Sequence, residues 1–319
     1  MADPIAITQL NSLTLREDRV TLLSIVRDES YLLPFLLDHY RRLGVRQFAF
    51  IDDRSQDGTR ALLLAQPDCM VLECNRAWGE RIGKATRLHH HLKRFVPERL
   101  AGSGWVLTVD ADEFLFLPPG FADIAALTAH LDAIGQVCIP AALVDFYPPT
   151  LAGRNFDRGL SPFAGCPLFD RGPLFDWRPG RLQPFPAQAG VRARLAAMLF
   201  ADHRADFVEV YAEGFVLASL WKVPLLHWGR GVVPVGDHAV SAPPFLGMQA
   251  ALAHFKFCPG LDDKIAQAVS GGAYHRASLE YRMLARSVAL LGNRPLVDLA
   301  TRRWSGPAAL EAAFLTYVT

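Results

Sequence analysis

Three acidic residues, Asp110, Asp112 and Glu113, follow directly on an apolar segment that is typical of a buried strand. Side chains two residues apart on an extended strand end point to the same side, so Asp110 and Asp112 can share one hard cation. That cation could bridge a diphosphate and, as a Lewis acid, neutralise the charge that builds on a departing nucleoside diphosphate. The alternative interpretation is a charged turn between two buried strands, because residues 114–117 are apolar again.

Two further charged clusters follow apolar segments in the same way. Arg27, Asp28 and Glu29 follow the run from Val20 to Val26, and the pair Asp52-Asp53 follows the run from Arg46 to Ile51. A strand, a helix and a second strand in succession form a βαβ unit, which makes the sheet parallel and gathers the polar strand ends at its carboxyl edge. Open α/β sheets bind ligands at that edge, so we expect all three clusters to contribute to one site.

The elements expected to position these clusters alternate regularly up to Pro118. We expect strands at Val20–Val26, Arg46–Ile51, Cys69–Glu73 and Trp105–Val109. We expect helices from the N-cap Ser30 to Gly44, at Arg60–Ala65 and at about Gly83–Phe95. Beyond Pro118, the segment from about Pro148 to Gly190 is expected to be rich in loops, and helical periodicity returns at Leu246–Phe255 and Ser278–Leu291.

Composition narrows the classes of function. With 319 residues, 51% of them hydrophobic, the chain can build one large α/β domain or two small ones. Its 33 basic and 32 acidic residues nearly cancel, so no overall field attracts nucleic acid or an anionic membrane surface. An anionic ligand must therefore be held by local groups.

The cysteines and the apolar segments indicate a reduced, cytoplasmic protein. No CxxC pair occurs, so the cysteines fit small buried thiols better than a disulfide framework or a thiolate metal site. The amino terminus lacks the pattern of a signal peptide, and no stretch approaches the ~20 apolar residues of a membrane span. The cysteines are Cys69, Cys74, Cys138, Cys166 and Cys258.

Taken in order, these segments resemble the family-2-like glycosyltransferases of GT-A fold. The similarity runs from the first strand to the segment Asp110-Ala111-Asp112-Glu113-Phe114, and it is greatest to a bacterial subgroup with this DADEF form of the metal motif. Later segments are similar to the same subgroup. The matching segments are Val26–Glu29, His39–Val45, Ile51–Ser55, Asp57–Thr59, Trp105–Phe114, Gly190–Arg194, Trp221–Leu225 and His254–Phe257.

The resemblance implies a Rossmann-like, mostly parallel sheet flanked by helices. Residues 1–118 would form the half that binds the nucleotide sugar, and residues 119–319 a loop-rich acceptor-side half with the C-terminal helices. The implied activity is a metal-dependent transfer, with Mn²⁺ or Mg²⁺, of a sugar from a nucleoside diphosphate sugar to a hydroxyl acceptor. Inversion is expected, and the acceptor could be a glycan or a lipid-linked molecule in cell-surface glycan or polysaccharide synthesis.

Two other functions remain open at this point. One is a non-catalytic module that binds a nucleotide or sugar with the same fold. The other is a nucleotidyltransferase, which is disfavoured because the sequence has no glycine-rich phosphate loop. Neither the donor sugar, the acceptor nor the oligomeric state follows from the sequence.

The resemblance assigns the nucleoside to the first two strand ends. Arg27 and Glu29 would lie beside the base or ribose, and Asp53, with its neighbour Asp52, would hold the base. An ionised carboxylate accepts strongly from an imide N–H or a ribose hydroxyl, which agrees with this assignment. The alternative for Asp52 and Asp53 is a role in capping a helix or turn.

The metal and the diphosphate are assigned to other residues. The resemblance implies Asp112 as a direct metal ligand, Asp110 nearer the ribose or bound through water, and His254 as a further ligand. Glu113 would brace the loop. A buried structural histidine is the alternative for His254, and a solvated surface pair is the alternative for Arg192 and Arg194. Candidates for contact with the diphosphate or the acceptor are Arg192, Arg194, His238 and Lys256.

The general base has no clear signature. An inverting transfer needs a carboxylate or histidine that takes the proton of the acceptor hydroxyl. The candidates are Asp145, Glu213 and Asp237, of which we favour Asp237. The adjacent histidines 89–91 cannot converge on a metal from one helix, so we interpret them as structural.

Overall fold

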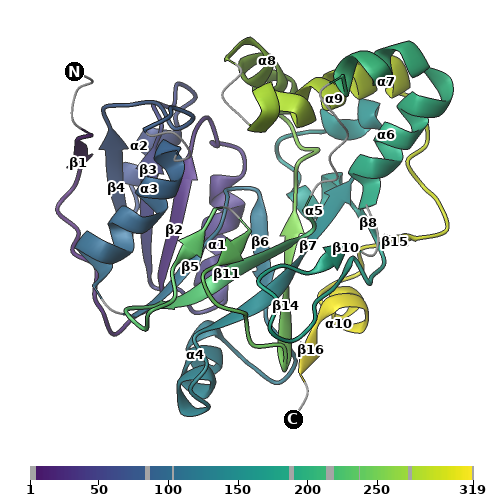
Figure 1. Cartoon of the computed structure of the whole chain (residues 1–319). Coiled ribbons are helices and arrows are strands. Elements are labelled where there is room, and N and C mark those ends of the chain that lie inside the picture. Colours follow the sequence, from purple (N-terminus) through teal and green to yellow (C-terminus); the bar gives the residue numbers. More distant parts are fainter. Residues whose placement is uncertain are drawn as a thin grey trace.

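One large sheet forms the centre of the fold, and helices cover both of its faces (Figure 1). The computed structural model describes residues 5–82, 87–102, 104–186, 190–212, 219–236, 238–271 and 275–317. Among these residues, no helix is both long enough and apolar enough to cross a bilayer. All five cysteines are buried free thiols, as predicted.

The elements are as follows. The strands are β1 (Ile7–Gln9), β2 (Thr21–Val26), β3 (Gln47–Asp52), β4 (Cys69–Cys74), β5 (Gly104–Thr108), β6 (Glu113–Phe116), β7 (Cys138–Tyr147), β8 (Leu168–Asp170), β9 (Phe175–Asp176), β10 (Phe185–Pro186), β11 (Trp221–Trp228), β12 (Pro234–Val235), β13 (Ala239–Val240), β14 (Met248–His254), β15 (Thr301–Arg303) and β16 (Thr316–Tyr317). The helices are α1 (Leu33–Arg42), α2 (Thr59–Leu64), α3 (Leu88–Val96), η1 (Pro97–Ala101), α4 (Ile124–Ala133), η2 (Leu151–Arg154), α5 (Pro162–Gly165), α6 (Gly190–Asp202), α7 (Arg204–Val210), α8 (Leu261–Gly271), α9 (His275–Leu291) and α10 (Ala308–Phe314).

Most of the central strands run in one direction. The order in the sheet is β1-β4-β3-β2-β5-β11-β7-β14-β16, and β6, β8 and β15 pair off this path. β2, β3, β4 and β5 pair in parallel, β7 pairs in parallel with β14, and β11 is antiparallel to both β5 and β7. β4, β3, β2, β5, β7 and β14 therefore point the same way. The predicted Rossmann-like α/β fold with a mostly parallel sheet is confirmed, and the arrangement is consistent with its GT-A type.

The strands are continuous apolar runs because both faces of the sheet are covered. On β2, Leu22 packs into a core that includes α1, whereas its neighbour Leu23 packs into the opposite core with Leu92 of α3. α1 ends before Gly44, whose φ of +93° suits glycine. The predicted cap at Ser30 is wrong, since α1 begins at Leu33 and the Ser30 amide donates to Asp57.

The four predicted strands are confirmed as β2 to β5, and the helix predicted at Ser278–Leu291 lies within α9. The helix predicted at Leu246–Phe255 is wrong, because this segment forms strand β14. Its alanines favour a helix in isolation, but the segment is hydrogen-bonded between β7 and β6 in the buried sheet. The middle segment has only short elements, as predicted. The division into functional halves at residue 118 stays a prediction.

The strand directions bring several sequence-distant residues to the carboxyl edge. β2, β3, β5 and β14 end there, and the antiparallel β6 and β11 begin there. At the end of β14, His254 is in register with Glu113 of β6 on one side and with Asp145 of β7 on the other. Glu113, His254 and Asp145 therefore form one row across three strands.

Candidate metal and nucleotide site

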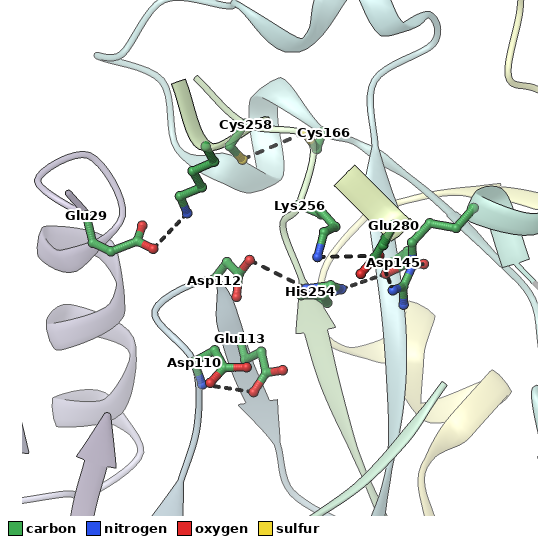
Figure 2. A network of polar contacts seen from close by, with 12 residues as sticks. Glu29, Asp110, Asp112, Glu113, Asp145, Cys166, His254, Lys256, Cys258 and Glu280 are labelled. Atoms are coloured by element: carbon green, nitrogen blue, oxygen red, sulfur yellow. Dashed lines mark hydrogen bonds and ion pairs between the residues drawn. The ribbon is translucent and has the colours of Figure 1, made fainter. Parts of the chain in front are cut away.

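Asp112, Glu113 and His254 converge at the carboxyl edge of the sheet (Figure 2). One ligand atom from each of these side chains lies within 4.8 Å of the others. The Nε2 atom of His254 is 3.5 Å from Asp112 Oδ2. Two carboxylates and an imidazole form a donor set that suits a divalent transition metal such as Mn²⁺ better than Mg²⁺, which prefers oxygen alone. The chemistry of the donor set therefore fits the predicted metal.

Backbone hydrogen bonds fix the loop that carries Asp112. The Glu113 amide donates to the Asp110 carbonyl at 3.1 Å, which closes a turn between β5 and β6. The Phe255 amide donates to the Asp112 carbonyl at 2.8 Å and ties this turn to the end of β14. The predicted alternative of a charged turn is thus correct as local structure, and the turn is also what presents Asp112 to His254.

His254 lies between two carboxylates. Its Nδ1 is 2.6 Å from Asp145 Oδ1, so the Nδ1–H donates to Asp145 and Nε2 faces Asp112. Burial opposes charge on the ring, but Asp112 and Asp145 raise the pKa of His254 to about 9. Burial opposes charge on Asp112 as well, yet His254 and Lys264 bring its pKa well below the usual range. Coordination through Nε2 would require His254 to give up its second proton.

Asp145 is a poor general base in this arrangement. Its side chain is 3% exposed, and both carboxylate oxygens are occupied, Oδ1 by His254 and Oδ2 by Arg192 Nε at 2.7 Å. Arg192 is itself buried and donates through Nη1 to Glu280 at 2.7 Å. The geometry therefore favours an orienting role for Asp145 over the predicted catalytic role, and Arg192 is engaged with carboxylates rather than turned toward a phosphate.

Asp110 belongs to a separate ion cluster beside the metal group. Lys222 Nζ, 5% exposed, is 2.8 Å from Asp110 Oδ2 and 2.5 Å from Glu113 Oε1, and Lys93 Nζ is 3.8 Å from Asp110 Oδ1. Burial opposes charge on Asp110, but Lys222 and Lys93 lower its pKa to about 2. Glu113 also accepts from the Asp110 amide at 3.0 Å, so it does brace the loop while offering an oxygen to the metal group.

The residues on the nucleoside side differ in burial: Asp52 and Asp53 are buried, with Asp53 9% exposed, and Arg27 is exposed. Asp52 is fully buried and bound to Arg60 Nε at 2.6 Å, which leaves it no face toward a ligand. Asp53 accepts from the Trp78 amide at 3.2 Å and lies 3.6 Å from Arg27 Nη1. Arg27 is exposed at the same edge. Asp53 and Arg27 thus remain candidates for nucleoside contact, whereas Asp52 has a structural partner.

Helix α8 contacts the carboxyl edge of the sheet through Lys264. Lys264 Nζ donates to Glu29 Oε1 at 2.7 Å, which joins α8 to the end of β2. Burial raises the pKa of Glu29 to about 7, against the effect of Lys264. Lys256 lies 3.4 Å from Glu280 and 5.1 Å from the centre of the Tyr281 ring. Lys256 and Lys264 both act on the Asp112 carboxylate electrostatically, so they place positive charge around it.

The other predicted residues lie apart or cannot be placed. Arg194 pairs with Asp170 and Asp298, and has no contact with the metal group among its described ion pairs. His238 Nδ1 is 2.8 Å from the Trp221 carbonyl oxygen. Glu213 and Asp237 lie outside the described residues.

Lys222, Lys264 and Glu280 were not singled out from the sequence. Lys222 does lie in a segment that resembles the family, and this was a usable signal. Lys264 and Glu280 lie on helices whose packing against the sheet edge has no local sequence signature.

No protein-family profile and no curated protein matches the chain. Among solved structures, Staphylococcus aureus TarS is 14% identical over 40% of this chain and 22% of its own, with a TM-score of 0.30. 4-Diphosphocytidyl-2C-methyl-D-erythritol synthase is 18% identical over 41% of this chain and 59% of its own, with a TM-score of 0.24. A putative glucose-1-phosphate thymidylyltransferase from Bacillus anthracis is 8% identical over 84% and 83%, with a TM-score of 0.30. This chain thus spans less than two thirds of the first two. Such scores reflect a partial likeness, so the site's own geometry carries the functional conclusion.

Proposed function

We propose that this chain is a metal-dependent glycosyltransferase that transfers a sugar from a nucleoside diphosphate sugar to a hydroxyl acceptor. The observation that carries the proposal is the convergence of Asp112, Glu113 and His254 on one point at the carboxyl edge of the parallel strands. This edge also carries Arg27 and Asp53, at the ends of the two neighbouring strands β2 and β3. A metal group and a nucleoside group side by side are what a nucleotide-sugar donor requires.

The residues take roles that follow from their positions. Asp53 accepts from the base, with Arg27 beside it, and the partly open Asp110, 48% exposed, faces the ribose. Lys256 and Lys264, which already act on Asp112, attract the diphosphate. Asp112, Glu113 and His254 hold a divalent cation, preferably Mn²⁺. When bound, this cation neutralises charge on the departing nucleoside diphosphate.

The general base in this proposal is Asp237, the candidate favoured from the sequence. Its chain neighbour Gly236 lines a hollow that also reaches Lys93 and Lys222, beside Asp110. Asp145 is left out of this role because both of its oxygens are engaged.

The test compares Asp112→Asn with Asp176→Asn. Asp176 is exposed on β9 and pairs with Arg178, so its amide variant is a control for the loss of one carboxylate. We expect Asp112→Asn to keep the circular dichroism spectrum while abolishing Mn²⁺-dependent release of UDP or GDP from their sugar conjugates. The Asp176→Asn variant should retain wild-type turnover. Undiminished turnover by Asp112→Asn would refute the proposal.

A thermal-shift screen separates this activity from a non-catalytic module. UDP and GDP are each added with Mn²⁺ and with EDTA, and the change in Tm is recorded. Stabilisation that depends on Mn²⁺, together with donor turnover, supports the transferase. The same stabilisation without turnover across a panel of hydroxyl acceptors would favour a binding module, and no response to either nucleotide would count against both.

A further inference from the structure

We propose that Arg192 is a positioning residue for the metal site: by anchoring Asp145, it holds the His254 ring with Nε2 toward Asp112. The inference rests on the proposed function and extends the metal site to α6, which supplies no residue to the metal group itself. The described hydrogen bonds of Arg192 are to Asp145 and Glu280, and none is to Asp112, Glu113 or His254. Of these two partners, Asp145 is the one that contacts His254, so the effect of Arg192 on the ring passes through Asp145.

The contacts make His254 orientation depend on Arg192. Asp145 divides its two carboxylate oxygens, giving Oδ1 to His254 Nδ1 at 2.6 Å and Oδ2 to Arg192 Nε at 2.7 Å. A carboxylate held at both oxygens cannot rotate without breaking one of the two hydrogen bonds. All three side chains are buried, so water is poorly placed to replace Arg192. An imidazole that binds a metal is commonly fixed through its second nitrogen in this way.

A closed ring of residues, joined by contacts and by the chain itself, supports the contact between Arg192 and Asp145. Arg192 Nη1 donates to Glu280 Oε1 at 2.7 Å, and Glu280 lies 3.4 Å from Lys256 Nζ (Figure 2). Lys256 is two residues beyond His254 in the chain, so the ring returns to its starting point. It joins β14, β7, α6 and α9, which fold together from segments far apart in sequence. The docking of α6 and α9 is thereby coupled to the geometry of His254.

The same helix offers a matched control. Arg194, two residues further along α6, also binds two carboxylates, Asp170 and Asp298, and contacts Tyr147. None of these partners touches His254 among the described contacts. A purely structural role would make Arg192→Gln and Arg194→Gln equivalent in their effect on metal binding, after any difference in stability is allowed for.

The experiment measures Mn²⁺ binding by electron paramagnetic resonance. We expect wild-type protein and Arg194→Gln to bind Mn²⁺ with the same Kd and to show the ¹⁴N coupling of a coordinated imidazole in pulsed spectra. Arg192→Gln should bind more weakly, by at most the roughly 10- to 100-fold typical of losing the direct partner of a metal-bound histidine, here Asp145, and with a reduced ¹⁴N coupling. His254→Asn gives the reference spectrum without a nitrogen ligand.

Each outcome decides between the inference and the proposed function. A wild-type Kd and a full ¹⁴N coupling in Arg192→Gln would overturn the positioning role alone. Absence of Mn²⁺ binding by the wild-type protein would overturn the proposed metal site, and the positioning role with it. If Arg192→Gln does not fold, Arg192→Lys replaces it, because lysine keeps the positive charge but lacks the guanidinium fork that binds Asp145 and Glu280 together. A weakened Kd in Arg192→Lys then supports the inference, and a wild-type Kd overturns it.

Discussion

Replacing Lys222 with methionine removes a buried ammonium that serves two carboxylates. Its Nζ lies 2.8 Å from Asp110 Oδ2 and 2.5 Å from Glu113 Oε1. Methionine preserves much of the side-chain volume, so the change isolates the charge. Glu113, 1% exposed, is left without its cation, whereas Asp110, about half exposed, keeps water and Lys93. The loss of stability should therefore arise mainly from the unpaired Glu113 carboxylate.

The expected loss is at the low end for a broken buried ion pair. Such breaks cost about 3–5 kcal/mol, and the exposure of Asp110 argues for about 3 kcal/mol. With 319 residues and an unfolding entropy of about 2.1 cal/mol/K per residue, this loss corresponds to a Tm decrease of roughly 4–5 °C. Urea unfolding at pH 7 and calorimetry measure the two quantities. The control is Arg178→Met, whose guanidinium pairs with Asp176 where both side chains are more than half exposed, so its loss should cost at most about 1 kcal/mol.

The loss of stability in Lys222→Met should also depend on pH. Burial raises the pKa of Glu113 even with Lys222 present, and losing Lys222 raises it further above that of the unfolded chain. The folded variant then binds more protons than its unfolded chain, so its stability increases as the pH falls. The difference from wild type is expected to be smaller at pH 5 than at pH 8. Equal stability of variant and wild type at pH 7, or a deficit that does not change over this range, would refute the reasoning.

Three further predictions follow from single residues. Burial lowers the pKa of His39 to about 4, so between pH 6.5 and 4 the unfolded chain binds the extra proton, and stability should fall with pH by up to about 3 kcal/mol; a His39→Gln variant whose pH profile matches wild type would contradict this. Under the proposed function, Asp53→Asn should weaken the Kd for UDP or GDP with Mn²⁺ at least about tenfold, because a hydrogen bond to a charged group contributes about 1.5–3 kcal/mol; an unchanged Kd by calorimetric titration argues against base contact. Gly44→Ala should lower Tm more than Gly58→Ala, since both have φ near +92° but only at Gly44 does a new Cβ meet a neighbour, Asp123 Cβ at 3.2 Å; equal losses would show that backbone strain alone matters.

The sequence was sufficient to predict which strand ends meet at one edge of the sheet. Short apolar runs such as residues 105–109 are typical of buried strands, and parallel strands bring their polar ends to one edge. This placed Asp112 and Asp53 at the correct edge. His254 was also predicted at the site, but from the resemblance, while its own segment was predicted as a helix. An alanine-rich apolar run fits both periods, and the strands on either side of it decide the outcome.

The partners of the site residues could not be predicted, because they depend on register between distant elements. The contact between Asp145 and His254 exists because β7 and β14 pair in parallel at one particular register. Asp52 and Asp53 are identical in type and adjacent in sequence, yet Arg60 of the α2 helix binds only Asp52. The turn after β5 places Glu113 at the start of β6, in register with His254, where its carboxylate can contribute an oxygen to the metal group. Local sequence carries none of these distances.

Under the proposed function, the charges gathered around the candidate site explain why nucleotide binding should require the metal. The described cluster contains five Lys or Arg side chains and six carboxylates, together with His254: Lys93, Lys222, Lys256, Lys264 and Arg192 face Glu29, Asp110, Asp112, Glu113, Asp145 and Glu280. With His254 protonated, as its raised pKa favours, and with all six carboxylates counted as ionised, the formal charges cancel and the metal-free cluster offers an anionic diphosphate no net attraction. Exchange of that proton for a divalent cation would change the formal charge to +1. The same cluster would then attract a diphosphate, and the contrast between Mn²⁺ and EDTA in nucleotide binding follows from this gain of one positive charge.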